Sequence, residues 1–232
     1  MASLDEYNFT TISDRVMHQI RSDILNGEFK AGQKLILSDL KDRYNVGGSP
    51  LREAMVQLSW QKYVTMKPQK GFWVADVSLN ELKSIIKARL AIGNVALRDA
   101  MDNGDEKWEL NILTTFHKLC RLDPSASDFD SNLWERRHKE FHMAIIACKG
   151  AEFVMSLMSS IYDQQERYRH ILLSSEFTYD SQYYDNNEHE AIMKAVLDRN
   201  FDLASDLVRQ HTEKLYQVIE KIGSLQSLKT AS

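Results

Sequence analysis

The sequence predicts a mainly helical protein with two domains, a small N-terminal domain that contains one β-hairpin and a larger all-α domain. Strand and tight-turn patterns are confined to the first 76 residues, and from there to residue 222 the chain consists of helical periodicities separated by short polar breaks. A length of 232 residues with 43% hydrophobic residues suffices for two modest cores. We therefore expect domains over residues 1–76 and 81–224, joined by a linker over 77–80.

The N-terminal domain is expected to open with two helices. Apolar residues recur at helical spacing over residues 12–25, with Ser13 as a candidate N-cap and Asn26-Gly27 as a stop. A second apolar stripe runs over residues 36–44. This helix is expected to end at Gly47-Gly48, because glycine adopts positive φ at a helix C-terminus without steric cost.

A third helix and a hairpin follow directly. Ser49 is a candidate N-cap with Pro50 at the first helical position, and Arg52 then lies in the first turn. Two strands are predicted over 63–67 and 72–76, joined across a turn that contains Lys70 and Gly71. Helix, turn, helix and hairpin in this order predict a winged helix-turn-helix, in which the first turn of the third helix and the hairpin tip meet DNA.

The distribution of charge supports this interpretation. The whole chain carries a formal net charge of -4, but residues 30–73 hold eight Lys and Arg against three Asp and Glu, a local net charge of +5. Charge alone would equally suit a solvated face, whereas charge together with the order of elements favours DNA. Arg43, Ser49, Arg52, Lys70 and Gly71 are the predicted DNA-contacting residues.

The remainder of the chain predicts a six-helix bundle, with helices near 78–101, 106–121, 131–148, 152–174, 181–198 and 201–222. The two cysteines, Cys120 and Cys148, lie in separate helical patterns and suit packing roles in a reducing compartment. We find no apolar run near 18 residues and no export signal, so we expect a cytoplasmic protein without membrane insertion.

Four histidines are candidate metal ligands in the bundle. His138 and His142 lie four residues apart and share one helix face, and His189 and His211 lie on the last two helices among apolar residues. Antiparallel packing would bring all four together. Imidazoles that converge from three helices suit a first-row divalent metal such as zinc, nickel or cobalt, and the alternative is a group of hydrogen-bonded core histidines.

Buried arginines are the candidate anion-binding residues. Arg89 lies among apolar residues of the first bundle helix, and Arg167 and Arg169 flank Tyr168 in the fourth. A guanidinium binds a carboxylate through two parallel hydrogen bonds, so arginines beside a metal would form a pocket for a small carboxylate. The alternative for each is a surface or salt-bridged role. We expect that role for one of Arg167 and Arg169, because positions two apart on a helix point about 200° apart.

The sequence resembles the GntR-type bacterial transcription regulators over most of residues 10–76. The resemblance rests on Gly27-x-Phe29-x-x-Gly32-x-x-Leu35, on residues 49–54 (Ser-Pro-Leu-Arg-Glu-Ala) and on the hairpin segment from Gln69 to Val74. The rest of the chain resembles the FCD effector domain of the FadR-like subfamily, in its six-helix VanR-type group. The segments that carry this second resemblance include Phe141-His142, Glu188-His189 and Arg209-Gln210-His211.

The resemblance implies a homodimer that binds an inverted-repeat operator, a divalent metal held by the histidines, zinc before nickel, and an organic acid as effector. Arg89 is the strongest ligand candidate on this basis. Further segments, among them Arg43-Tyr44-x-Val46-Gly47 and Arg167-Tyr168-Arg169, resemble the carbon-starvation-induced type, which represses glutarate-utilisation genes. Glutarate and 2-hydroxyglutarate are therefore the first effectors to expect.

Two positions depart from the family pattern. Many FCD domains carry Asp where this chain has His138, so an anionic ligand would be replaced by a neutral one and the ion would keep its full +2 charge. The family commonly has Ser or Thr followed by Arg where this chain has Gly47-Gly48, so one DNA contact is missing. Specificity would then rest more on Arg52, Ser49 and the wing.

These observations favour a ligand-responsive transcription regulator, a repressor released from its operator by a small carboxylate, and not an enzyme. A metal-dependent enzyme in a helical bundle is the first alternative, but the chain lacks the His-Glu-x-x-His and repeated Glu-x-x-His patterns and an enzyme would not explain the wing. A DNA-binding protein with a purely structural helical domain is the second alternative. It keeps the wing but has no ligand pocket.

Overall fold

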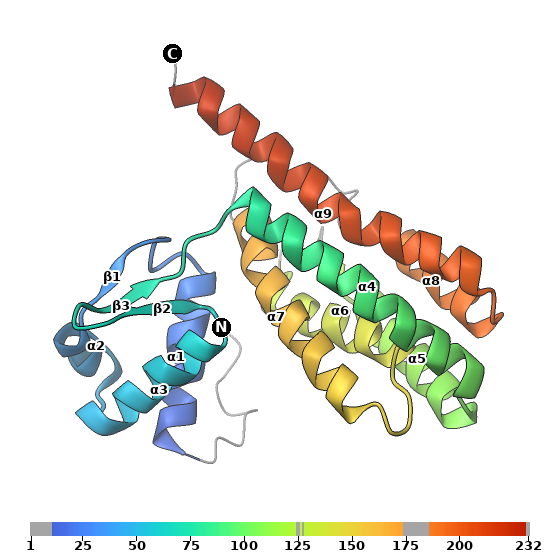
Figure 1. The fold of residues 1–232 in the computed structure, drawn as a ribbon, viewed down its shortest axis with the longest axis horizontal. Helices are drawn as coiled ribbons and strands as arrows, with labels where there is room; N and C mark the ends of the chain where they lie inside the picture. The colour runs from blue at the N-terminus through green and yellow to red at the C-terminus, as the bar shows by residue number, and fades with distance from the viewer. Residues whose placement is uncertain (1–10, 124–125, 127, 174–185, 231–232) are drawn as a thin grey trace. The chain divides into compact units, whose positions relative to one another are not determined.

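The computed structural model describes residues 11–123, 126, 128–173 and 186–230, and the chain divides into two compact units between Val77 and Ser78. The fold is mainly helical, as the sequence predicts (Figure 1). Leu79 and Asn80, which the sequence assigned to a linker, are the first two residues of a bundle helix whose N-cap is Ser78. Among the described helices, none has an apolar stretch long enough to cross a membrane.

The N-terminal unit contains helices α1 (Ile12–Leu25), α2 (Leu37–Tyr44) and α3 (Gly48–Trp60) and strands β1 (Lys34–Leu35), β2 (Val64–Lys67) and β3 (Gly71–Val74). The antiparallel sheet has the order β1-β3-β2, so the hairpin is extended by a third, short strand that the sequence did not reveal. One core unites α1, α3 and the inner sheet face; it includes Val16, Ile20, Leu51, Met55, Leu58, Val64 and Phe72.

Three expected helix ends in this unit are corrected. Thr11, not Ser13, caps α1, and its hydroxyl accepts a hydrogen bond from the Asp14 amide at 3.1 Å. The second helix ends at Asn45, which adopts the left-handed conformation at φ 46° before the glycines are reached. Asparagine shares with glycine a tolerance for this conformation. The third helix therefore starts at Gly48 with Gly47 as N-cap, one residue before the expected Ser49.

The second unit contains α4 (Leu79–Asn103), α5 (Glu106–Cys120), α6 (Ser131–Ile145), α7 (Glu152–Leu173), α8 (Asn186–Leu197) and α9 (Phe201–Thr230). These match the predicted helices closely, although α9 continues eight residues further. Residues 174 and 181–185, expected to be helical, lie outside the described residues. Helix α4 packs against α7 and α9, α5 against α6 and α8, and α8 against α9. One core unites all six helices and includes Leu97, Ile112, Phe141, Met158, Ile192 and Ala204.

Candidate functional sites

The predicted DNA-contacting residues of α3 and the wing lie on the surface of the N-terminal unit. Leu51, Met55 and Leu58 are fully buried, as expected for the inner stripe of α3, and this places Arg52 on its exposed side. At the wing tip Lys70 is exposed and Gly71 has φ +102°, a conformation that other residues rarely adopt. No atom lies within 4 Å of the position that a Cβ of Gly71 would occupy, so the backbone is open to a close approach.

The other two predicted contacts have local partners. Ser49 is exposed and its hydroxyl donates to the Glu53 carboxylate at 3.4 Å. Arg43 forms ion pairs with Asp23 at 2.8 Å and Glu28 at 3.2 Å, and its guanidinium lies 4.9 Å from the centre of the Phe29 ring. A DNA role for Arg43 therefore requires exchange of two carboxylates for phosphate, and it stays a prediction.

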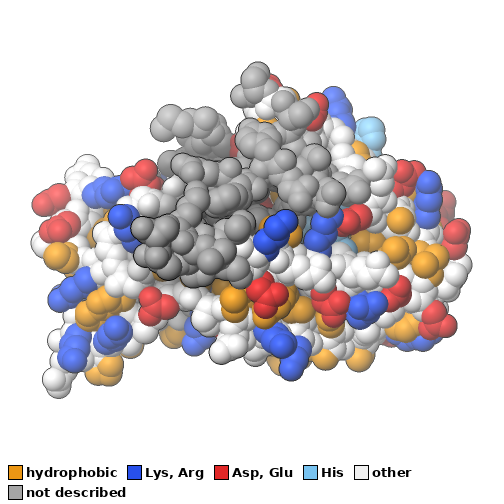
Figure 2. Space-filling view, turned by 90° about the horizontal axis from the view of Figure 1, so that it is seen from above, with side chains coloured by type: hydrophobic (Ala, Val, Ile, Leu, Met, Phe, Trp, Pro, Cys, Tyr) orange, Lys and Arg blue, Asp and Glu red, His pale blue; other side chains and the backbone are white. Residues whose placement is uncertain are grey.

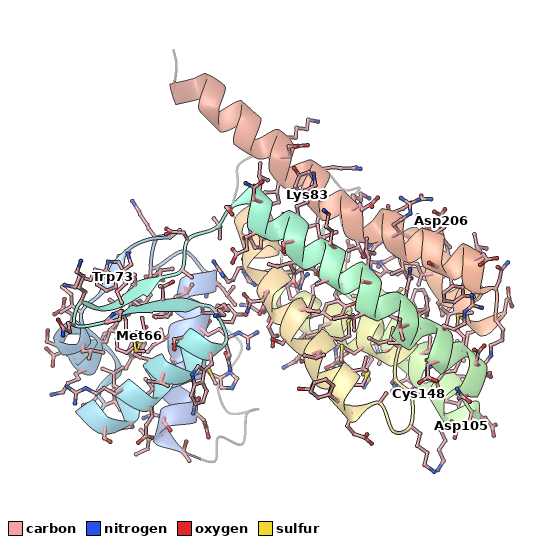
Figure 3. The ribbon with its side chains drawn as sticks, viewed as in Figure 1. Met66, Trp73, Lys83, Asp105, Cys148 and Asp206 are labelled. Atoms are coloured by element: carbon pink, nitrogen blue, oxygen red, sulfur yellow. The ribbon has the colours of Figure 1, made fainter. Side chains whose placement is uncertain are left out.

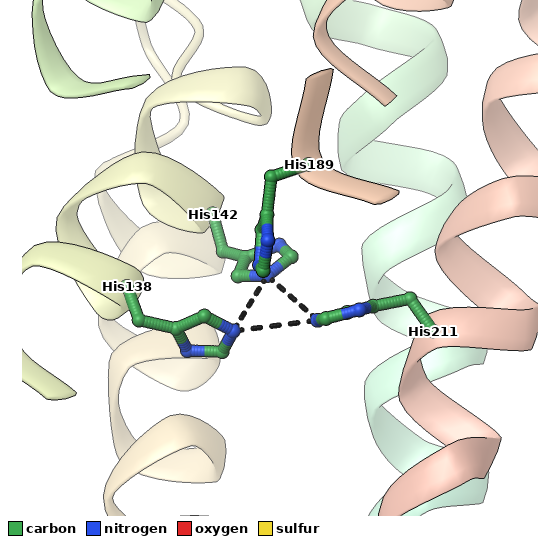
Figure 4. Close-up of side chains that lie close together, drawn as sticks. All are labelled: His138, His142, His189 and His211. Carbon is green, nitrogen blue, oxygen red and sulfur yellow. Dashed lines mark hydrogen bonds between the residues drawn. The ribbon is translucent and has the colours of Figure 1, made fainter. Parts of the chain in front are cut away.

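The four predicted metal-binding histidines meet in the interior of the second unit (Figure 4). One ring nitrogen from each lies within 4.8 Å of the others. The Nε2 atoms of His138 and His142 are 3.1 Å apart, and His211 Nε2 lies 3.1 Å from His142 and 3.3 Å from His138. His189 packs edge-on against His211 with ring centres 4.6 Å apart, so the packing of α8 against α9 brings these two histidines together, as expected.

Hydrogen bonding alone cannot satisfy this arrangement. A neutral imidazole nitrogen either carries a proton or offers a lone pair, so each contact needs one nitrogen of each kind. Three Nε2 atoms in mutual contact cannot all be paired in this way, because at least two of the three must be alike. A cation between them removes the conflict, since all three then present lone pairs to one ion.

The dimensions and protonation of the cluster also fit a metal ion. A tetrahedral zinc with Zn–N bonds of about 2.0–2.1 Å separates its ligand nitrogens by roughly 3.3 Å, close to the observed 3.1–3.3 Å. Burial lowers the pKa of His138 and His142 well below the usual value for histidine, and the neighbouring histidines lower it further. Both rings are therefore neutral at pH 7, as ligation requires.

Glu188 fixes the orientation of His211. Its carboxylate accepts a hydrogen bond from His211 Nδ1 at 3.0 Å and a second from Lys214 Nζ at 2.6 Å. Burial opposes its ionisation, but these two bonds outweigh burial and lower the pKa of Glu188 to about 2. A charged acceptor at Nδ1 keeps the proton there and turns the Nε2 lone pair towards the cluster, as carboxylates commonly do for metal-binding histidines. The sequence indicated Glu188 only through its place beside His189.

Arg89 lies one aromatic ring away from the cluster. It is buried and donates to Gln165 Oε1 at 2.6 Å and to the Tyr162 hydroxyl at 2.8 Å, and its guanidinium lies 4.2 Å from the centre of the Tyr162 ring. Tyr162 in turn stacks on His142 with ring centres 5.8 Å apart. Sequence analysis missed Tyr162 and Gln165. Tyr162, Gln165 and Arg169 are spaced i, i+3 and i+7 and therefore share one face of α7. This spacing could have identified Tyr162 and Gln165 from the sequence.

The other three effector candidates, Arg167, Tyr168 and Arg169, have different surroundings. Arg169 forms a buried ion pair with Glu135 at 2.6 Å, the salt-bridged role expected for one of the two flanking arginines. Burial raises the pKa of Glu135 to about 7 despite the attraction of Arg169. The Tyr168 hydroxyl donates to Glu81 at 2.5 Å and so joins α7 to the start of α4. Arg167 is buried, with its guanidinium 6.0 Å from the Tyr168 ring centre. Effector roles for Arg167, Tyr168 and Arg169 remain predictions.

A surface cleft of about 490 Å³ adjoins the cluster on the side of α8 and α9. It is lined by His211 and by both groups that hold it in place, Glu188 and Lys214, together with Leu207, Arg209, Gln210, Glu213 and Gln217. The side chain of His211 is 9% exposed, whereas those of His138, His142 and His189 are almost fully buried. Of the four clustered histidines, His211 is thus the nearest to solvent.

A wing beside a recognition helix, followed by a separate helical domain, is the arrangement of a DNA-binding transcription regulator. Comparison with protein families agrees: residues 12–74 match the bacterial regulatory proteins of the gntR family, and residues 84–214 match the FCD domain. The chain therefore belongs to the GntR family of transcription regulators with an FCD domain, and its relatives are regulators, not enzymes.

The chain is 35% identical over 198 residues to the HTH-type transcriptional repressor GlaR of Escherichia coli K12, which covers 83% of this chain and 88% of GlaR. It is 30% identical over 221 residues to the HTH-type transcriptional regulator BphR of Paraburkholderia xenovorans LB400, covering 94% and 89% of the two chains. Among solved structures, E. coli McbR/YncC superimposes with a TM-score of 0.73 over 92% of this chain and 99% of its own. At 14% identity, this likeness supports the fold alone.

Proposed function

We propose that this DNA-binding regulator is a homodimeric repressor that binds a divalent metal, zinc before nickel, and leaves its operator when a small dicarboxylate binds beside the metal. Glutarate and 2-hydroxyglutarate are the first candidates, by the family resemblance described above. The observation that carries the proposal is the juxtaposition of the histidine cluster with Arg89, across the single ring of Tyr162. We place the protein in the cytoplasm because its DNA target lies there.

The donor set accounts for the choice of metal. His138, His142, His189 and His211 offer neutral imidazole nitrogens and no carboxylate, a set that suits zinc and nickel better than magnesium or calcium. A bound ion would supply two positive charges that no ligand of this set neutralises. Glu188 lowers the net charge only from one side, behind His211, and is itself shared with Lys214. The interior of the domain would then attract an anion.

Arg89 supplies the second recognition element. Its hydrogen bonds to Gln165 and Tyr162 are to uncharged acceptors, and a carboxylate accepts a stronger, bidentate bond from the same guanidinium. Arg169 already has the Glu135 carboxyl as its partner, which leaves Arg89 as the guanidinium that would exchange uncharged acceptors for a ligand carboxylate. An acid with two separated carboxylates would use both the guanidinium and the charge at the histidines, whereas a monocarboxylate could use only one.

Two-fold symmetry would let two α3 helices read the halves of an inverted repeat, with the helical domains supplying the dimer surface. Effector binding would shift the population of dimers away from the arrangement that fits the operator. Couplings of this kind are typically about 1–3 kcal/mol, which corresponds to roughly 5–150-fold in operator affinity. Release of this size is measurable by titration.

The test uses the full-length protein and an operator duplex selected from random DNA. Metal content is measured after purification without chelator, and glutarate is then titrated against the labelled complex, with the uncharged 1,5-pentanediol as control. We expect about one zinc or nickel per chain and release by glutarate only. A metal-free protein that binds DNA and ignores every acid would instead support the alternative of a purely structural helical domain.

A further inference from the structure

The outer face of the wing sheet carries a second basic element that the predicted DNA contacts do not include. Strand register places Lys34 opposite Trp73, and Trp73 opposite Thr65. Their neighbours Leu35, Phe72 and Val74 are buried in the core, so Lys34 and Trp73 lie on the other, solvent-facing side. Figure 3 shows Trp73 and Met66 on opposite sides of the hairpin, as this alternation requires.

Two lysines flank the Trp73 ring. The ammonium of Lys67 lies 4.7 Å from the ring centre and that of Lys34 lies 5.4 Å from it, within the range of cation–π attraction. Lys34 comes from β1 and Lys67 from the end of β2, so one indole ring on the central strand holds cations from both neighbouring strands. The ring thereby limits the freedom of two side chains that would otherwise be mobile.

The hairpin segment that carries Trp73 and Lys67 contains basic but no acidic residues. Residues 64–74 contain Lys67 and Lys70 and no Asp or Glu. Lys34 and Lys67 are both exposed, and Lys67 directly precedes the tip turn that presents Lys70 and Gly71. Seen from above (Figure 2), the N-terminal unit at the left carries Lys and Arg side chains with hydrophobic and acidic side chains between them.

We propose that Lys34, Trp73 and Lys67 form a phosphate clamp that binds the DNA backbone next to the wing tip. The inference rests on the winged helix as the DNA-contacting part of the proposed function. In it, the two ammonium groups bind backbone phosphates and Trp73 is a positioning residue that holds both. Such contacts set register and affinity but carry no sequence information. They would offset the missing basic residue at Gly47-Gly48, where the third helix begins.

The test measures operator affinity of the full-length protein against salt concentration for Lys34→Ala/Lys67→Ala. Each phosphate contact contributes about 0.9 to the slope of log affinity against log salt, so the double variant should lose about 1.8 from that slope. Preference for the operator over mismatched duplexes should stay unchanged. Lys34→Arg/Lys67→Arg should restore the slope, and Trp73→Leu should weaken binding with the net charge unchanged while Trp73→Phe weakens it less.

Lys118→Ala is the matched control, because Lys118 is an exposed lysine on α5 in the other unit. Circular dichroism establishes that each variant is folded, and the arginine variant tests the role of charge even if the alanine variant is unstable. A slope for the double variant equal to that of Lys118→Ala would refute the clamp, as would a shifted operator preference. If Arg52→Ala weakens operator binding in the same assay, a failure of the clamp leaves the proposed function intact. If neither the double lysine variant nor Arg52→Ala weakens operator binding, the clamp and the proposed function are both contradicted.

Discussion

Replacement of His142 by alanine should remove the stabilisation that the protein gains from zinc. His142 Nε2 takes part in two of the three close nitrogen contacts in the cluster, and its ring is fully buried. A ligand that binds only the folded state stabilises it by about 2.7 kcal/mol at a free concentration 100-fold above its dissociation constant. For a domain of this size that corresponds to roughly 5–11 °C in melting temperature.

The assay is scanning calorimetry of the full-length protein in a chelator-free buffer, with and without buffered zinc. The quantity compared is the zinc-induced shift within each variant, so any cavity left by His142→Ala cancels. His117→Ala is the control, because His117 is an exposed histidine on α5 outside the cluster, and it should keep the full shift. A wild-type shift below about 1 °C, or a full shift in His142→Ala, would show that the cluster is a group of core histidines.

Substitutions at three further residues test separate parts of the structure. Arg52→Ala should cost about 1–3 kcal/mol of operator affinity, measured by fluorescence anisotropy, and an unchanged affinity would remove this residue from the interface. Glu188→Ala should weaken zinc binding about 10–100-fold in a chelator competition, with Glu188→Gln less affected because the amide oxygen still accepts from His211 Nδ1; equal affinities would contradict the orienting role. Arg199→Ala should lower the free energy of unfolding, measured in urea, by about 2 kcal/mol. The Arg199 guanidinium donates to two carbonyl oxygens at the end of α4, that of Met101 at 2.5 Å and that of Gly104 at 2.9 Å. A loss under about 0.5 kcal/mol would show that water replaces these bonds.

The order of elements and the histidine cluster could be predicted because both follow from local periodicity. His138 and His142 share a face whatever surrounds the helix, and the short connection at Arg199 makes α8 and α9 antiparallel neighbours. The sequence pattern also predicted strands in the N-terminal unit alone. The two-residue strand β1 escaped notice because it is too short for any alternation to show.

Contacts that join distant helices could not be predicted. Glu188 and His211 lie 23 residues apart, and Glu135 and Arg169 lie 34 apart, so their pairing depends on how the helices pack. The predicted boundary between α2 and α3 was wrong for a different reason. Asn45 and the two glycines that follow at Gly47-Gly48 can all end a helix, and periodicity does not decide which of them does.

The most direct test of the proposed account is titration of glutarate into the zinc-loaded protein bound to a labelled operator, followed by fluorescence anisotropy. We expect glutarate at millimolar concentration or below to lower the anisotropy of the wild-type complex and to leave that of the Arg89→Ala complex unchanged. Arg98→Ala is the control, because Arg98 is an exposed arginine on the same helix as Arg89, and its complex should respond as the wild type does. Loss of DNA from Arg89→Ala at the same acid concentration as from the parent, or no release from the parent by any C4 to C6 dicarboxylate, would contradict it.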